Sequence, residues 1–295
     1  HAGTAWFLAR LAKRTNDPEI LAAANRSIDF MVANSIVLDP ERSYFGAPRR
    51  RDGMAWVGTT ALAALAANAV DRPIALQWGR FVASSVGTNG QVRGELKREE
   101  GVFLDQKKNP YGQGQTTLAI AALVRSGHEE FRPTLDQLAQ YLDGDYAPGG
   151  VGRLIILDEH WTCLAALAIQ DVTGQAAGAE ICHAYLSQGK NDAPSAESRI
   201  RPFSGSAGGH AEAVVAGAFL ERSYREEALA YGQWFLQSAY IESDASLLPV
   251  PRALIGGFRD TPYQLDVRMD AVQHIGCALL GIEALLGQLH PGALP

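Results

Sequence analysis

The chain has 295 residues, of which 47% are hydrophobic and 20% are charged, and its formal net charge is −6. This composition is ordinary for a globular protein with a large core, and the negative charge argues against a nucleic-acid partner, because phosphate binding requires a positive field. No apolar stretch is expected to span a membrane, because Thr, Gly, His or Gln interrupts each one.

The cysteines and the first residue bear on compartment. Cys163, Cys182 and Cys277 are odd in number and without close spacing, so no disulfide framework is expected and a reducing compartment, such as the cytoplasm, is favoured. The chain starts at His1 inside a helical pattern and without a Met. We therefore expect that an N-terminal segment has been removed, which leaves the original compartment open.

Taken in chain order, two classes of helix alternate at an irregular period of roughly 50 residues. Segments that are small and apolar nearly all round predict buried inner helices, over 2–14, 57–70, 113–126, 159–173, 210–221 and 271–288. Amphipathic segments with apolar residues at helical spacing predict outer helices, over 17–35, 73–87, 129–143, 176–189 and 223–240. Ala, Gly and Thr in the inner class would let neighbouring backbones approach closely. Residues 1–295 therefore read as one repeat-built domain.

The connections between the helices are asymmetric. Inner-to-outer turns are short, whereas the outer-to-inner connections are long, over about 36–54, 88–112, 144–158, 190–208 and 241–270. Loops longer than about 12–15 residues are uncommon unless they are functional or disordered. All five lead into the start of an inner helix, so one end of the molecule is elaborated and is the expected functional face. Residues 90–96 are β-like and could pair locally.

Alternating inner and outer helices in six copies resemble an (α/α)6 toroid, the superfamily of six-hairpin glycosidases, sugar epimerases and polysaccharide lyases, with related terpenoid-cyclase and lanthionine-synthetase toroids. The resemblance covers the whole chain and rests on architecture. The stretch Tyr111-Gly-Gln-Gly-Gln-Thr-Thr is similar to the Gln-Gly-Gln stretch of glucuronyl C5-epimerase domains. The resemblance implies an all-α fold around a funnel. Because little follows Leu289, we expect an incomplete ring of about eleven helices, open there or closed by a missing N-terminal segment or a partner.

Three histidines occupy the same position in successive inner helices: His160, His210 and His274. If those helices point the same way around one axis, the three imidazoles gather at one end. Acidic residues accompany them, with Glu159 beside His160, Glu212 beside His210 and Asp270 near His274. Such pairs suit acid–base chemistry, and the predicted catalytic residues are Glu159, His160, Glu212, Asp270 and His274. The alternative is structural, because acidic residues also cap helix starts.

The elaborated face also carries groups suited to binding. Glycines before His210 allow a tight turn or a close ligand approach. An arginine can grip a carboxylate with two hydrogen bonds, and Trp or Tyr can stack on a sugar. The predicted substrate-binding residues are Trp56, Tyr111, Gln113, Gln115, Trp161, His210, Arg259, Asp260, Tyr263, Arg268 and Gln273. For the charged residues of 259–270, a salt-bridged loop that closes the ring is an equal alternative.

We expect a carbohydrate-active enzyme, a hydrolase, lyase or epimerase, that acts on a small-molecule or oligosaccharide substrate without a cofactor; the toroid resemblance supplies this substrate class. A zinc-dependent or prenyl/cyclase-type toroid is one alternative, because the three histidines could bind zinc, with Cys163 and Cys277 each three residues after a His. No metal is the preferred expectation. A non-catalytic toroid that binds a ligand or partner protein is the other alternative.

Overall fold

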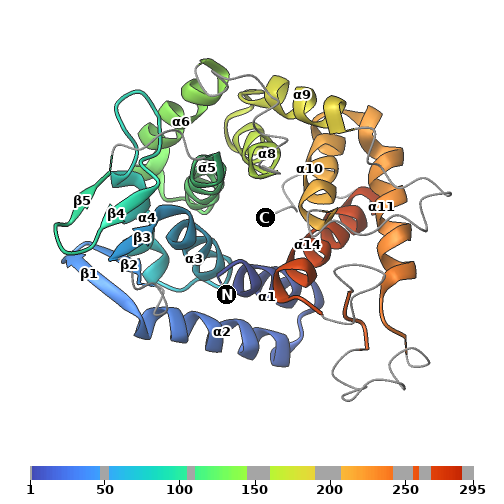
Figure 1. The fold of residues 1–295 in the computed structure, drawn as a ribbon, viewed down its shortest axis with the longest axis horizontal. Helices are drawn as coiled ribbons and strands as arrows, with labels where there is room; N and C mark the ends of the chain where they lie inside the picture. Colours follow the sequence, from blue (N-terminus) through green and yellow to red (C-terminus); the bar gives the residue numbers. More distant parts are fainter. Residues whose placement is uncertain are drawn as a thin grey trace.

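The computed structural model describes residues 2–46, 53–104, 110–144, 160–189, 207–241, 255–258 and 267–287. Its helices form two concentric layers (Figure 1). The inner layer comprises α1 (Ala2–Thr15), α3 (Val57–Ala69), α5 (Pro110–Arg125), α8 (Trp161–Thr173), α10 (Ala207–Leu220) and α14 (Met269–Leu286). The outer layer comprises α2 (Pro18–Ala33), α4 (Ile74–Ser84), α6 (Arg132–Gly144), α9 (Ala179–Gly189) and α11 (Arg225–Ser238). The predicted toroid, its two helix classes and their order are confirmed.

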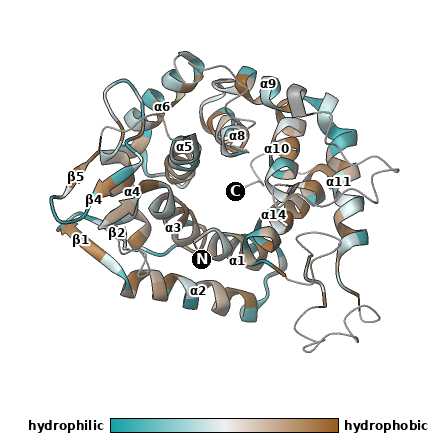
Figure 2. Ribbon diagram, viewed as in Figure 1, coloured by the Kyte–Doolittle hydropathy of each residue, from teal (hydrophilic) through white to brown (hydrophobic). Residues whose placement is uncertain are grey.

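Inner helices pack closely because small residues face their neighbours. Added at Gly58 of α3, a Cβ would collide with the side-chain oxygen of Gln115 in α5, and one at Gly3 of α1 would collide with that of Gln273 in α14. Helix α3 buries nine of its 13 residues, as expected for a helix that is apolar on every side. The hydrophilic residues lie mostly on the outer layer and the connections (Figure 2).

The inner ring closes where α14 packs against α1. Phe7 of α1 fills the space over Gly276 of α14, and Arg14 pairs with Glu283 across the same joint, with 2.6 Å between Nη2 and Oε1. In the described ranges the outer layer has five helices and none follows α14. The eleven-helix prediction is therefore confirmed, with the outer layer incomplete and the inner ring closed. A partner or further segment over the remaining outer position stays a prediction.

The short and long connections also differ in structure. In the turn between α1 and α2, Asp17 accepts hydrogen bonds from the backbone N–H groups of Glu19 and Ile20 and so caps α2. The long connections carry antiparallel strands: β1 (Ser35–Asp39) pairs with β2 (Arg42–Phe45), and β3 (Met54–Trp56), β4 (Glu95–Lys97) and β5 (Val102–Phe103) form a second sheet. The β-like stretch over 90–96 does pair, because Val92 forms an antiparallel bridge with Val86 and the last two residues of the stretch lie in β4.

A disulfide joins Cys163 of α8 to Cys182 of α9, which makes the expectation of unpaired cysteines wrong. The two residues are 19 positions apart but lie on the two helices of one hairpin, which brings their Cα atoms to 4.8 Å. Cys277 is free and buried. Because disulfides persist mainly in oxidising compartments, the argument for a reducing compartment loses its support.

Among the described residues, α14 is the one helix long and apolar enough to cross a membrane by length and composition. This corrects the expectation that no stretch has that length. Half of the helix is buried, because it packs between α10 and α1 in the inner ring. Core helices of this kind pass the same test, so α14 gives no clear membrane span.

The disulfide yields a stability prediction. Reduction should lower the free energy of unfolding by about 3 kcal/mol, because the bond closes a loop of about 20 residues in the unfolded chain. Thermal unfolding of the wild type with and without dithiothreitol should show a fall in Tm, and C163A/C182A should show no effect of the reductant. Three reactive thiols in the denatured, unreduced protein, instead of one from Cys277, would contradict the disulfide.

Candidate active site

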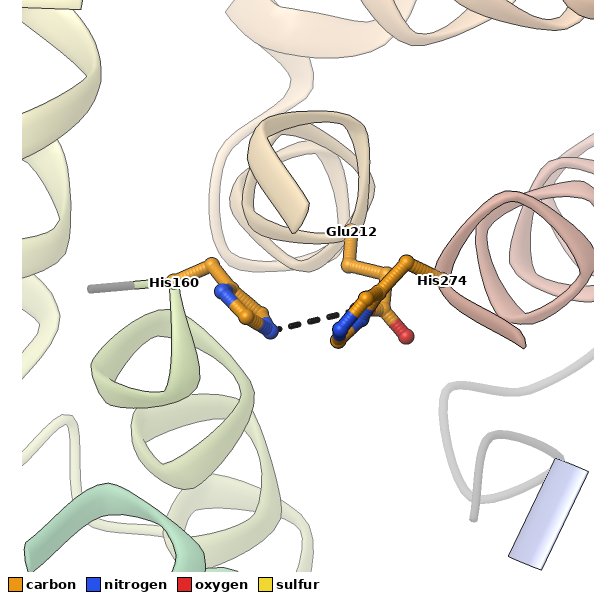
Figure 3. A group of neighbouring side chains, drawn as sticks. All are labelled: His160, Glu212 and His274. Atoms are coloured by element: carbon orange, nitrogen blue, oxygen red, sulfur yellow. Dashed lines mark hydrogen bonds and ion pairs between the residues drawn. The ribbon is translucent and has the colours of Figure 1, made fainter. Parts of the chain in front are cut away.

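Three side chains from three inner helices meet at one point (Figure 3). His160 lies at the N-cap of α8, and Glu212 and His274 lie in the second turns of α10 and α14. Nδ1 of His274 is 2.6 Å from Oε2 of Glu212, and Nε2 of His160 is 3.3 Å from the same oxygen. The two imidazole centroids are 4.8 Å apart. We call these three residues the triad.

Glycines in α10 make room for the triad. A Cβ at Gly209 would lie 2.8 Å from Nδ1 of His160, and one at Gly208 would lie 2.8 Å from Cβ of His274. Real Cβ atoms do not approach neighbours so closely. The glycines expected to admit a ligand therefore admit the two imidazoles from the neighbouring helices.

Trp161 forms a wall behind the imidazoles. Its ring centroid is 4.5 Å from that of His160 and 5.9 Å from that of His274, and its other neighbour is Trp6 of α1 at 6.2 Å. Only 2% of Trp161 is exposed. This tryptophan, predicted to contact substrate, is instead placed to fix the orientation of the two imidazoles.

Glu212 is the acidic member of the triad and lies inside an apolar ring of helices. Glu212 is 2% exposed. Burial alone would raise the pKa of its carboxyl, but the charge of His274 and the hydrogen bonds from His160 and His274 more than offset burial and lower the pKa to about 2. Among the described residues, no geometric hydrogen bond reaches its second oxygen, Oε1, and the buried Cys277 thiol interacts with the same carboxyl group. The carboxylate is thus held ionised by the two imidazoles.

A cavity continues from Glu212 along the inside of the ring. Its polar lining residues are Arg10, Asp171, Glu212 and Cys277, and the remainder are apolar residues of α5, α8, α10 and α14. Asp171 pairs loosely with Arg125, with 3.9 Å between Oδ2 and Nη1. Burial raises the pKa of Asp171 and of the Cys277 thiol. The sequence interpretation missed these groups, although Asp171 is a charge in an otherwise uncharged inner helix, as Glu212 is.

The structure does not bring every predicted histidine and carboxylate to the triad. His210 lies between Tyr185 and Tyr231, with ring centroids 5.7 and 5.9 Å away, so it faces the outer helices. The expectation that three imidazoles gather is therefore wrong for this one. Asp270 forms an ion pair with Arg268, with 2.5 Å between Oδ2 and Nη2 on the surface. The predicted partnerships of His210 with Glu212 and of His274 with Asp270 are replaced by the triad.

Some predicted binding residues are buried between helices, some are exposed, and others lie outside the described residues. Gln113 is buried and holds a loop, because it accepts a hydrogen bond from Val92 N–H and donates one to Gly90 C=O. The Gln273 amide lies 3.2 Å from Nδ1 of His274, beside the triad, and Gln115 packs against Gly58. Trp56 and Tyr111 are exposed. Four further predicted site residues lie outside the described residues: Glu159, Arg259, Asp260 and Tyr263.

Comparison with known proteins identifies the fold of the chain but does not assign it to a family. No protein-family model and no curated protein sequence matches the chain. Similar solved structures include a D-mannose isomerase (10% identity, 96% of this chain and 86% of that one, TM-score 0.67). Another is a GH76 α-mannanase of Bacteroides thetaiotaomicron (8% identity, 97% of this chain and 86% of that one, TM-score 0.65). A third is a cellobiose 2-epimerase of Spirochaeta thermophila (13% identity, 97% of this chain and 86% of that one, TM-score 0.61). The chain therefore has the (α/α)6 toroid fold of these proteins.

The low pKa of Glu212 predicts how stability depends on pH. Because the pKa in the folded state, about 2, is below the ordinary value of 4.5, the stabilisation is fully present above pH 4.5 and is lost as the pH falls towards 2. Between pH 5 and pH 3 this group should account for a loss of about 2 kcal/mol in the free energy of unfolding. Urea unfolding should show this excess loss in the wild type relative to E212Q. Equal pH dependence in the two proteins would contradict the charged triad.

Proposed function

We propose that this protein is a sugar-processing enzyme that moves a proton on its substrate, as a sugar isomerase or epimerase does. The observation that carries the proposal is the hydrogen bond between Nδ1 of His274 and Glu212. With Nδ1 protonated and donating to the carboxylate, a neutral imidazole carries its lone pair on Nε2, the atom that acts as a base. Glu212 also stabilises the imidazolium that forms when Nε2 accepts a proton, as the carboxylate of a catalytic triad does.

The exposure of the two imidazoles separates their roles. The side chain of His274 is 19% exposed, whereas that of His160 is 5% exposed. His274 is therefore the base that would touch substrate, and His160 is a second contact that holds the carboxylate oxygen. In an open-chain sugar, His274 would take the proton on the carbon beside the carbonyl and leave an enediolate whose negative charge lies on the former carbonyl oxygen. If the neighbouring hydroxyl proton moves to that oxygen and His274 returns its proton to the former carbonyl carbon, the product is the isomer. If a proton from solvent is instead added to the opposite face of the first carbon, the product is the epimer.

Hydrolysis has less support from the described residues. Glycosidases of the common classes need two carboxylates that flank the bond to be cleaved, whereas the triad contains one, and Asp270 is engaged by Arg268. The similar structures include proteins named for sugar isomerisation and epimerisation as well as a mannanase. Their shared fold supports the sugar class by analogy, and the single carboxylate between two imidazoles favours proton transfer.

A deuterium-exchange assay tests the proposal. Mannose, glucose and cellobiose incubated with the protein in D2O should gain deuterium beside the carbonyl carbon, as followed by NMR. H274A and E212Q should lower the exchange rate at least about 100-fold, because a positioned acid–base group contributes roughly 10² to 10⁴. The matched control is H183A, since His183 is on outer helix α9 and pairs with Glu221. H274A activity within tenfold of wild type would exclude His274 as the base.

Metal-dependent chemistry is a second candidate, because the triad is also a possible metal site. Its two imidazole nitrogens and one carboxylate oxygen lie within 4.8 Å of one another, and this donor set suits zinc or non-haem iron. Cys163 is not available as a ligand, since it is bonded to Cys182. The 2.6 Å between His274 and Glu212 is a hydrogen-bond distance and is shorter than the roughly 3.3 Å between two ligand atoms on a tetrahedral zinc. A shared proton therefore fits the triad better.

Metal analysis separates the two candidates. If proton transfer by imidazole is correct, the purified protein should contain well under one equivalent of zinc or iron, and dialysis against EDTA should leave its exchange activity unchanged. One equivalent of bound metal that H160A removes, together with activity restored only by that metal, would replace the proton-transfer proposal with the metal-dependent one.

A further inference from the structure

The inner helices start at one common end of the ring. Residues of the first two turns contact each other across four joints: Gly58 of α3 meets Gln115 and Gly112 of α5, Gly209 of α10 meets His160 of α8, Gly208 meets His274 of α14, and Gly3 of α1 meets Gln273. At the other end, Arg125 in the last turn of α5 pairs with Asp171 in the last turn of α8. Neighbouring inner helices therefore run in the same direction across these joints. We call the end where they start the mouth.

Two halves of the mouth carry different chemistry. The triad occupies the starts of α8, α10 and α14, whereas the starts of α3 and α5 carry aromatic residues. Trp56, the N-cap residue of α3, is 47% exposed, and Tyr111, in the first turn of α5, is 37% exposed. By contrast, Trp6 and Trp161, the tryptophans of the inner helices behind the triad, are at most 2% exposed.

The two exposed aromatics are neighbours on a firm support. Trp56 ends strand β3, where it pairs with Glu95 of β4, and Gly58, two residues later, lies against Gly112, which follows Tyr111. The strand pairing fixes the backbone position of Trp56, and 47% of the residue is exposed. Large aromatic faces held in solvent beside a reaction centre are typical of binding surfaces.

The order of the ring sets the two halves apart. In the contact order α1, α3, α5, α8, α10, α14, α3 lies opposite α10 and α5 lies opposite α14 (Figure 1). Packed helix axes are about 8–10 Å apart. In a ring of six helices, the axes of two helices on opposite sides are therefore roughly 16–20 Å apart. Tyr111 of α5 therefore faces His274 of α14 across the ring, whereas α3, which carries Trp56, is separated from α14 by α1 alone, with axes roughly 14–17 Å apart in a six-membered ring. A single sugar ring that reaches His274 is too small to lie on either aromatic at the same time.

We propose that Trp56 and Tyr111 form a sugar-stacking subsite across the mouth from the triad, and that the substrate is an oligosaccharide of two or more linked sugar units. The reacting unit lies at the triad and a following unit lies on the aromatic pair. The apolar C–H face of a pyranose ring packs against an aromatic ring, while its hydroxyl groups remain in water. This inference rests on the proposed function for the class of ligand, and it adds chain length as the basis of selectivity.

Direct binding tests the subsite without relying on catalysis. Isothermal titration of E212Q, chosen to prevent turnover, would use mannose and glucose and their linked oligomers of two to four units. The Kd should fall by about tenfold from the monosaccharide to the oligomers. W56A in this background should remove that gain and leave the monosaccharide Kd unchanged, Y111A should reduce the gain, and W56F should retain most of it.

A matched control exists on the outer layer. Phe30 of α2 is 47% exposed, as Trp56 is, so F30A removes an equally exposed aromatic from an outer helix instead of an inner one and should leave every Kd unchanged. A chain-length gain that survives W56A, equal affinity for monosaccharides and oligomers, or no binding of any sugar in the panel would overturn the subsite. Oligomer binding that depends on Trp56 without any deuterium exchange would support the subsite and refute the proposed proton transfer.

Discussion

A carboxylate can remain ionised inside an apolar helical ring only if donors surround it, and Glu212 is the group on which this site depends. Burial opposes its charge, and the two imidazoles reverse that effect by converging on one of its oxygens. Because each of the three residues comes from a different inner helix, their meeting requires α8, α10 and α14 to be packed in one register. The charge state of Glu212 therefore depends on how these three helices pack.

Small residues of the inner helices allow this packing. Gly208 and Gly209 leave space on α10 into which His274 and His160 fit, so the imidazoles reach Glu212 from both sides. Trp161 then closes the side away from the carboxylate. Contact with Trp161 therefore helps to fix the orientation of the two imidazoles.

The fold was predictable from the sequence because hydrophobic periodicity depends on local spacing alone. This periodicity distinguishes the inner from the outer helices. The site was predictable only in location. His210 and Glu212 are two residues apart and face different directions, and the rotation of α10 about its axis decides which of them points inward; a residue pattern does not contain that rotation. The disulfide was missed for a related reason. Cys163 and Cys182 look unrelated along the chain, yet they belong to the inner and outer helices of one hairpin, so the repeat itself carried the signal.

The contact between α1 and α14 has a consequence for how the protein is made. Arg14 and Glu283 are 269 positions apart, and the joint between their helices forms only after nearly all of the described chain has left the ribosome. Until then, the apolar side of α1 that α14 will cover is open to solvent, a state prone to aggregation and suited to chaperone binding. Contacts at such separation also slow folding. Since His274 itself belongs to α14, no partly synthesised chain that lacks this helix can contain the triad, and the proposed proton transfer requires the closed ring.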